Sequence, residues 1–257
     1  MIIGVVSGKG GVGKTTIASN LSYYLSSLGK DVTLIDCNVT TSHLNFNFGL
    51  FTANNTINKI LRGEKDFSEV IYKYKNLKIV PASLRLEDLE YVDLTQLKFF
   101  LKDLNSEFVF LDSAPGFGRE AMSILTSVDA VLLVTTPFIN SVADILRAKK
   151  ILEALQKIQL GVVVNMVKGK SYELKKNEIE AITGIKVVGE VPYDENVEIA
   201  LSKGKPFVEL NPNSPASIAI KKVSNRIFGT PIEEERFSFR EKIVEKIKKF
   251  GEKFRII

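Results

Sequence analysis

The chain has 257 residues, of which 35 are Lys or Arg and 30 are Asp or Glu, so its formal net charge at pH 7 is +5. The excess lies entirely in residues 236–257, whose eight basic and three acidic side chains leave 27 of each sign elsewhere. This distribution argues against a basic surface over the whole fold, and the 45% apolar content argues against disorder. The single cysteine, Cys37, excludes an intramolecular disulfide and a cysteine-ligated cluster within one chain, which indicates a reducing, cytoplasmic setting. We expect neither a signal peptide nor a membrane span.

Short apolar runs alternate along the chain with longer segments whose apolar residues follow a helical spacing. The runs predicted to be buried strands are residues 2–6, 32–35, 78–80, 108–111, 130–135, 160–164 and 186–188. The segments predicted to be helices are residues 14–28, 94–104, 119–126, 141–157, 173–183 and 215–228. This alternation predicts an α/β fold, with a doubly wound, mainly parallel sheet between two layers of helices in one domain over residues 1–229. Residues 230–235 are expected to form an acidic linker.

A glycine-rich segment, GKGGVGKTT, directly follows the first predicted strand and satisfies the phosphate-loop pattern G-x-x-x-x-G-K-[ST]. Glycines let backbone N–H groups converge on phosphate oxygens, and the helix that follows adds its positive N-terminal end. Lys14 is then expected to neutralise β- and γ-phosphate charge, and the Thr15 hydroxyl to ligate Mg²⁺. We therefore predict a site for ATP and Mg²⁺ at which the nucleotide contacts Gly8, Lys9, Gly10, Gly11, Val12, Gly13, Lys14, Thr15 and Thr16.

A second lysine, Lys9, lies within this loop, where it cannot easily approach the same phosphates as Lys14 without mutual repulsion. The loop with this lysine resembles the signature of the deviant Walker A P-loop ATPases, the MinD/ParA family. The resemblance implies that Lys9 reaches the phosphates of the partner in a nucleotide-sandwich dimer, so ATP-dependent dimerisation is expected. The alternative is a solvated loop lysine.

Two acidic residues end predicted strands at the edge where an α/β sheet binds its ligand: Asp36 and Asp112. Carboxylates there can hold Mg²⁺ or its waters, so the predicted metal set is Thr15, Asp36 and Asp112. Residues 108–116, FVFLDSAPG, resemble the family's Walker B segment. The resemblance implies an outer-sphere Mg²⁺ role for Asp112 and a position beside the γ-phosphate for Gly116. Without the phosphate loop, such an Asp would be interpreted as a turn or N-cap residue.

One position departs from the family pattern. MinD-like ATPases usually read Asp-x-Asp after the second strand, the second acid being associated with positioning or activating the attacking water, whereas this chain reads Asp36-Cys37-Asn38. An amide cannot take up a proton, so base assistance worth about 10²-fold or more is expected to be missing unless Asp36 supplies it. The sole histidine, His43, is either a surface loop residue or one that responds to nucleotide or a partner. The predicted catalytic set is Lys9, Lys14, Asp36, Asn38 and Asp112, with slow hydrolysis.

Contacts to the nucleotide base are assigned by resemblance. Asn165, which closes the predicted strand at 160–164, resembles the asparagine with which the family reads the adenine edge, because its amide offers both a donor and an acceptor. Residues 191–194, VPYD, resemble the loop that covers the base, which implies contacts from Pro192 and Asp194. The alternatives are a turn residue and a strand edge. The resemblance extends to about residue 229 and favours MinD over ParA, because the chain begins at the loop strand.

The last 22 residues carry apolar side chains at spacings that fall on one stripe of an α-helix, with mostly basic residues opposite. Such a helix suits an anionic membrane surface, and MinD proteins likewise carry a C-terminal amphipathic helix. Docking on the parent domain or on another helix is the alternative. The residues predicted to contact the membrane are Phe239, Ile243, Ile247, Phe250 and Phe254.

The leading hypothesis is a MinD-like ATPase switch that dimerises on ATP, associates with the cytoplasmic face of the cell membrane and positions a cellular component, with an activator or effector protein as a further partner. Pairing two weak anchors would explain nucleotide control of attachment. One alternative is a ParA-like, ATP-dependent DNA-binding partition protein, which the charge-neutral body disfavours. Another is a slow-turnover, nucleotide-gated scaffold that binds a protein partner.

Overall fold

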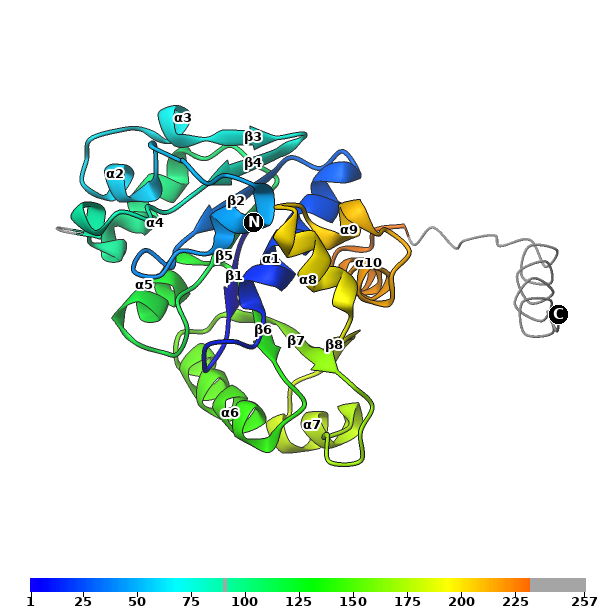
Figure 1. The fold of residues 1–257 in the computed structure, drawn as a ribbon. Helices are drawn as coiled ribbons and strands as arrows, with labels where there is room; N and C mark the ends of the chain where they lie inside the picture. The colour runs from blue at the N-terminus through cyan, green and yellow to red at the C-terminus, as the bar shows by residue number, and fades with distance from the viewer. Residues whose placement is uncertain (90–91, 232–257) are drawn as a thin grey trace, which may run out of the picture.

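The computed structural model describes residues 1–89 and 92–231. Within them, eight strands form one sheet in the order β3-β4-β2-β5-β1-β6-β7-β8 (Figure 1). The predicted α/β class is confirmed, because the described strands all pair in parallel except β3, which pairs antiparallel with β4. The strands are β1 Ile2–Val6, β2 Val32–Asp36, β3 Tyr72–Tyr74, β4 Leu77–Val80, β5 Phe108–Asp112, β6 Ala130–Thr135, β7 Ile158–Val167 and β8 Val187–Pro192.

Helices cover both faces of this sheet (Figure 1). The longer helices are α1 Lys14–Ser27, α5 Arg119–Ser127, α6 Ile139–Ala154, α7 Lys176–Thr183, α8 Glu195–Ser202 and α10 Pro215–Phe228. Shorter ones are α2 Ile57–Leu61, α3 Phe67–Val70, α4 Leu97–Phe100 and α9 Phe207–Leu210, and a 3₁₀ turn, η1, spans Leu44–Phe48. Because most crossovers contain a helix, the parallel strands place their carboxyl ends at one edge and their amino ends at the other.

Alternate strand residues supply two separate cores. Ile3 and Val5 of β1 pack with α1, α8, α9 and α10 on one face, called the α1 face below. Val6 of β1 and Leu111 of β5 pack with α2 to α7 on the opposite face. Strands buried on both faces are typical of parallel sheets, which is why they appear in the sequence as continuous apolar runs.

Several predicted elements differ from the structure. The segment 94–104 is three short helical pieces rather than one helix, although Leu94, Leu97 and Leu101 are all buried on one face as predicted. Glu173 precedes α7 instead of starting it, because its carboxylate accepts backbone N–H groups of Lys168 and Lys170 at 3.0–3.2 Å. The sequence patterns missed β3, α2, α3, α8 and α9.

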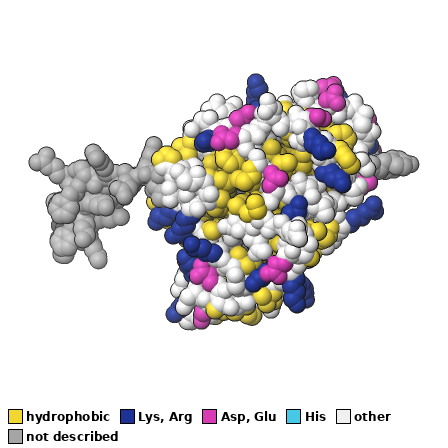
Figure 2. All heavy atoms as spheres, turned by 180° about the vertical axis from the view of Figure 1, so that it is seen from behind, with side chains coloured by type: hydrophobic (Ala, Val, Ile, Leu, Met, Phe, Trp, Pro, Cys, Tyr) yellow, Lys and Arg dark blue, Asp and Glu magenta, His cyan; other side chains and the backbone are white. Residues whose placement is uncertain are grey.

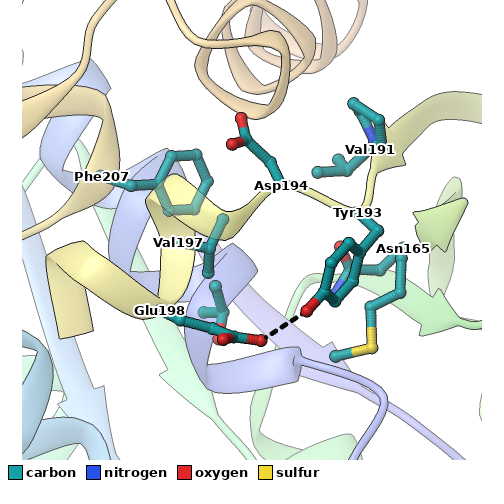
Figure 3. A pocket seen from close by; sticks show the side chains of 10 residues that line it. Asn165, Val191, Tyr193, Asp194, Val197, Glu198 and Phe207 are labelled. Carbon is teal, nitrogen blue, oxygen red and sulfur yellow. Dashed lines mark hydrogen bonds between the residues drawn. The ribbon is translucent and has the colours of Figure 1, made fainter. Parts of the chain in front are cut away.

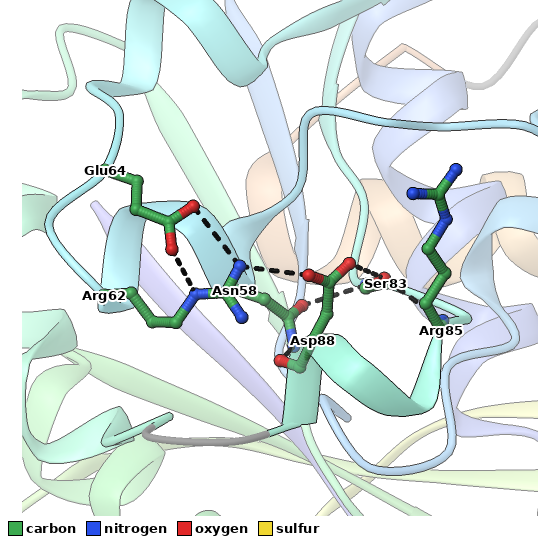
Figure 4. A network of polar contacts seen from close by, with 6 residues as sticks. All are labelled: Asn58, Arg62, Glu64, Ser83, Arg85 and Asp88. Carbon is green, nitrogen blue, oxygen red and sulfur yellow. Dashed lines mark hydrogen bonds and ion pairs between the residues drawn. The ribbon is translucent and has the colours of Figure 1, made fainter.

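A partly buried polar network fixes the loop that follows β4 (Figure 4). The Asp88 carboxylate accepts Ser83 Oγ at 2.6 Å and pairs with Arg62 Nη2 at 3.0 Å, which ties the loop to the end of α2. Asn58 of α2 closes the network, since its Nδ2 donates to the Asp88 carbonyl at 2.9 Å and its Oδ1 accepts Ser83 N–H at 2.9 Å. These bonds therefore anchor the loop after β4, which lies at the carboxyl edge of the sheet.

The C-terminal helix of the described domain, α10, ends at Gly229, which adopts φ +65°. The next two residues remain attached to the domain, because Thr230 Oγ1 donates to Ser224 Oγ at 3.0 Å and Tyr24 Oη donates to the Pro231 carbonyl at 3.2 Å. The predicted amphipathic helix over 236–257 lies outside the described residues. Among the helices of residues 1–89 and 92–231, none combines the length and the apolar composition that a membrane span requires.

Candidate functional site

The predicted phosphate loop lies at the carboxyl edge between β1 and α1. Gly13 directly precedes α1 with φ +90°, and a Cβ at this position would lie 2.1 Å from Asn165 Nδ2, so only glycine fits. Gly8 is equally constrained, because a Cβ there would lie 2.0 Å from Asp144 Cβ of α6. The loop therefore packs closely against Asn165 of β7 and Asp144 of α6.

A hollow above this loop gathers most of the predicted phosphate-binding residues. It is lined by Gly10, Gly11, Gly13, Lys14, Thr15, Thr16, Asn38, Thr41, His43, Pro115 and Met166. Lys14 is 7% exposed, whereas Lys9 lies on the exposed rim of the loop. Thr41, His43 and Met166 were not predicted as contacts, although the position of His43 after the second strand was a usable signal. These three side chains line the hollow because of how the loop after β2 and the end of β7 fold. No local sequence pattern specifies either backbone path.

The two predicted acids meet at the ends of neighbouring strands. Asp36 and Asp112 are direct register partners in β2 and β5, and both are fully buried. Asp36 is well supplied with donors, because Ser42 Oγ donates to its Oδ2 at 2.6 Å and Asn38 N–H donates to its Oδ1 at 3.0 Å. Neither carboxylate oxygen of Asp112 accepts a hydrogen bond from the described residues.

Burial sets the protonation of this pair. Burial raises the pKa of Asp36 to about 7, and the nearby Asp112 carboxylate adds to the increase. Burial likewise raises the pKa of Asp112 to about 6, while the charge of Lys14 and the proximity of the Thr15 hydroxyl oppose it. Two buried carboxylates side by side are costly to ionise together, so this arrangement favours a cation at the site.

These residues fit Mg²⁺ bound to a nucleotide. Mg²⁺ prefers oxygen ligands and retains waters, and a carboxylate whose buried oxygens lack donors is a partner for the ion or its waters. Thr15 lies beside Asp112 at the start of α1 and would supply the hydroxyl ligand, with Asp36 and Asp112 as the carboxylates. Lys14 and the N–H groups of the loop would hold the phosphate oxygens, where a bound Mg²⁺ would help to neutralise the phosphate charge.

The side chain of Asn38 forms hydrogen bonds within its own loop. Its Nδ2 donates to the Thr41 carbonyl at 2.6 Å, and its Oδ1 accepts the Thr41 hydroxyl at 3.0 Å. This reciprocal pair closes the turn after β2 and holds Asn38 at the wall of the phosphate hollow. In this conformation the amide shapes the loop, and it offers no group that accepts a proton.

A second, mostly apolar pocket lies next to the phosphate loop (Figure 3). It brings together the predicted base contacts Asn165, Pro192 and Asp194 with Tyr193, which belongs to the loop predicted to cover the base, and with Phe207, which was not predicted as a contact. Asn165 Nδ2 donates to the Val12 carbonyl at 2.9 Å, so the residue assigned to the base also holds the phosphate loop.

The carboxylate of Asp194 has a structural role as well. It accepts Asn196 N–H at 3.0 Å as the N-cap of α8, and Ala216 N–H at 3.1 Å at the start of α10. At the pocket rim Tyr193 Oη donates to Glu198 Oε1 at 2.8 Å (Figure 3). The pocket is therefore an apolar slot with a few polar groups, of the kind that holds a planar base.

Gly116 reaches the phosphate loop from β5. Its N–H donates to the Ser7 carbonyl at 3.0 Å, and Ser7 Oγ in turn donates to the Lys9 carbonyl at 2.8 Å. The segment after β5 and the rim bearing Lys9 are thus joined through Ser7. With Asp36, Asp112 and Asn165, the structure gathers the predicted positions around one site at the carboxyl edge.

Comparisons with known proteins identify the family of this chain. Residues 3–207 match the model of the CobQ/CobB/MinD/ParA nucleotide binding domain. An uncharacterized ATP-binding protein of Methanocaldococcus jannaschii is 36% identical over 97% of both chains. The septum site-determining protein MinD of Thermotoga maritima is 30% identical over 99% of this chain and 98% of the relative.

A similar solved structure contains a bound nucleotide. The septum site-determining protein MinD of Pyrococcus horikoshii, complexed with Mg-ADP, aligns with a TM-score of 0.85 at 26% identity, over 88% of this chain and 95% of that one. The cofactors of this site are accordingly ATP and Mg²⁺. Because the family model covers residues 3–207 and MinD of Thermotoga maritima is 30% identical over 99% of this chain, the chain belongs to the MinD/ParA family of ATPases.

Proposed function

We propose that this chain is an ATP-hydrolysing switch that dimerises on ATP, associates peripherally with the cytoplasmic face of a membrane through residues 236–257, and positions a cellular component. The observation that carries the proposal is the contrast between the two lysines of one loop. Lys14 is buried and lines the phosphate hollow, while Lys9 is exposed and is not among the residues that line it. An exposed cation at the rim of the loop supports a role toward a second nucleotide, carried by a partner subunit.

Oligomeric state tests the dimer. We expect the protein to be monomeric without nucleotide and with ADP, and dimeric with ATP, by light scattering coupled to size exclusion. Lys9→Ala should remain monomeric with ATP and should still bind it, because the other loop contacts are intact. Lys59→Ala, on α2 outside the site, is the matched control. Dimerisation that Lys9→Ala does not impair would refute this part of the proposal.

Turnover is proposed to be slow, which makes the ATP-bound dimer long-lived. Asn38 cannot accept a proton, and its amide is bonded to Thr41. Asn38→Asp should raise the steady-state ATPase rate by about 100-fold, the lower end of what a general base contributes. A wild-type rate that is already fast without an activator, and that Asn38→Asp does not raise, would argue against this assignment.

Membrane association is proposed to follow dimerisation. Two linked weak anchors bind far more tightly than one, so ATP would control attachment by pairing two copies of residues 236–257. Vesicles containing an anionic phospholipid should co-sediment the protein with ATP, less of it with ADP, and none of the variant lacking residues 236–257. Vesicles of neutral lipid are the control for charge. Binding that ignores both nucleotide and the terminal segment would contradict the proposal.

The charges of the described domain support a membrane rather than DNA. Four lysines surround one hollow at the amino edge, but three are paired with acids: Lys30 with Glu107, Lys75 with Glu209, and Lys78 with Asp31, all at 2.7–2.8 Å. The fourth is Lys73. DNA binding usually needs an unneutralised basic face on the fold. A salt-sensitive gel shift that appears with ATP and persists without residues 236–257 would favour the partition-type alternative instead.

A further inference from the structure

Strand β7 contains one extra residue at the nucleotide site. Val164 and Val167 of β7 are three residues apart, whereas the residues of β8 with which they pair are two apart. This is a β-bulge, and Met166 within it adopts φ +61°, in the left-handed region that favours glycine. The other non-glycine residues with a positive φ within residues 1–89 and 92–231 are Lys75 and Gln156, which lie in turns. Met166 therefore carries its backbone strain inside a strand.

The bulge changes which side chains share a face of the sheet. Residues along a strand normally alternate between faces, as Val163 on the α1 face and Val164 on the opposite face do. Regular alternation would place Val167 on the α1 face, yet Val167 packs against the opposite core. The inserted position is Met166, which lines the base pocket together with its neighbour Asn165. The strained backbone thus turns two consecutive side chains into one pocket.

Met166 lies at the boundary between the two hollows of the site. Among the described residues, only Met166 and Thr16 line both the phosphate hollow and the base pocket. The Cε methyl of Met166 is 3.7 Å from the point that a Cβ on Gly13 would occupy, so the thioether lies beside the phosphate loop. A nucleotide that fills both hollows must therefore pass its sugar by Thr16 and Met166.

Partial exposure of a methionine is not in itself a sign of function, since hydrophobic side chains are visible over much of the face seen in Figure 2. Met166 differs because its exposed part, 37% of the residue, lines a binding site, and because its backbone conformation costs free energy. We propose that Met166 contacts the sugar of the bound nucleotide, and that the bulge serves to place its thioether there. An unbranched thioether adapts its shape to an apolar surface such as the C–H face of a sugar. The contact requires a nucleotide at this site but neither dimerisation nor membrane association.

Ligands that share a triphosphate but differ in the rest of the molecule test this contact. In calorimetric titrations with Mg²⁺, Met166→Ala should weaken the binding of ATP and of ribose 5-triphosphate each about two- to fivefold, as expected when the exposed third of a methionine is no longer covered. The affinity for inorganic tripolyphosphate, which has no sugar, should stay unchanged. Ile182→Ala is the matched control, because Ile182 on α7 is 38% exposed and lines neither hollow.

Each other pattern of affinities would overturn the proposal. Unchanged ATP affinity in Met166→Ala would show that the side chain does not touch the nucleotide. A loss that extends equally to tripolyphosphate would assign its effect to the phosphate loop, and a loss for ATP alone would assign it to the base. An equal loss in Ile182→Ala would show that the effect is not local to the site.

Thermal unfolding without nucleotide tests the strained backbone separately from the ligand. Met166→Gly and Met166→Ala both lack the thioether, but only the alanine keeps a Cβ at positive φ. Met166→Gly should therefore unfold about 2–4 °C above Met166→Ala. The same pair of substitutions at Gln156, which has φ +53° in an exposed turn, should show the same order and leave ATP affinity unchanged. If Met166→Ala is at least as stable as Met166→Gly, residue 166 is not left-handed and the proposal fails.

Discussion

Replacing Asp112 by Asn tests whether the buried acidic pair is built for a cation. The substitution keeps the shape of the side chain and removes a charge whose two oxygens are buried without hydrogen-bond donors among the described residues. In the nucleotide-free protein at pH 8 both acids are ionised, because the pH lies above their pKa values, although burial raises those values and disfavours the charges. Asp112→Asn should therefore stabilise the free protein while it weakens Mg²⁺-dependent ATP binding.

The size of the effect follows from the pKa of Asp112, which burial raises from 3.8 to about 6. Ionising this group in the folded state at pH 8 costs about 3 kcal/mol relative to the unfolded chain. Removing the charge avoids this cost, but the introduced amide has N–H groups that are incompletely hydrogen-bonded. This offsets about 1–2 kcal/mol of the stabilisation. The remaining 1–2 kcal/mol corresponds to a rise in Tm of about 3–6 °C for a domain of this size.

The direction in which stability changes with pH is also predicted. A folded-state pKa above the unfolded value means that the folded protein binds more protons, so wild-type stability should increase as pH falls from 8 through 7 and 6. Asp112→Asn should flatten this rise, because it removes one group and lowers the pKa of its neighbour Asp36. Thermal unfolding from pH 5 to 8 without nucleotide, with exposed Asp103→Asn as the control, measures both effects. A variant less stable than wild type at pH 8, or a wild type whose stability does not rise on acidification, would refute the reasoning.

Other substitutions separate local from global effects. Gly13→Ala forces a Cβ against Asn165 and should weaken ATP binding more than tenfold in a titration, whereas Gly29→Ala, at φ +83° with open space around it, should cost only about 1 kcal/mol of stability and leave ATP affinity unchanged. Asn165→Ala should reduce the preference for ATP over GTP in a competition assay, because the base pocket loses its amide. Arg62→Ala leaves the Asp88 carboxylate with fewer donors and should lower the unfolding free energy by about 1–3 kcal/mol in denaturant, with ATP affinity retained.

Much of the fold could be predicted because buried parallel strands are continuous apolar runs. The limits predicted for 2–6 and 130–135 agree with β1 and β6, where every pattern points to the same element. The edge strand β3 was missed, since its sequence Tyr-Lys-Tyr is half-exposed and only three residues long. It pairs with β4 through a tight turn in which Lys75 adopts φ +53°. Turns with a positive φ are usually predicted from a glycine, and this turn has none.

The candidate site, like the fold, could be predicted from the sequence only in part. The phosphate loop and the acids at strand ends are local signals, so Lys14 and Asp112 could be placed from the sequence. The amide of Asn38 could not be, because its bonds to Thr41 depend on the path of a loop without secondary structure. Asp194 shows the opposite case, in which a residue assigned to the base by resemblance also caps α8 and holds the start of α10.

Helix α1 gives the two ends of this molecule a rigid connection. Its first residue, Lys14, belongs to the phosphate hollow, and Tyr24 near its other end holds Pro231, from which the terminal segment departs. Fourteen residues span about 21 Å, so a tilt of only about 5° at the loop moves the far end by about 2 Å, more than a hydrogen bond tolerates. A movement of the phosphate loop that tilted α1 by this amount would therefore break the hydrogen bond between Tyr24 and Pro231.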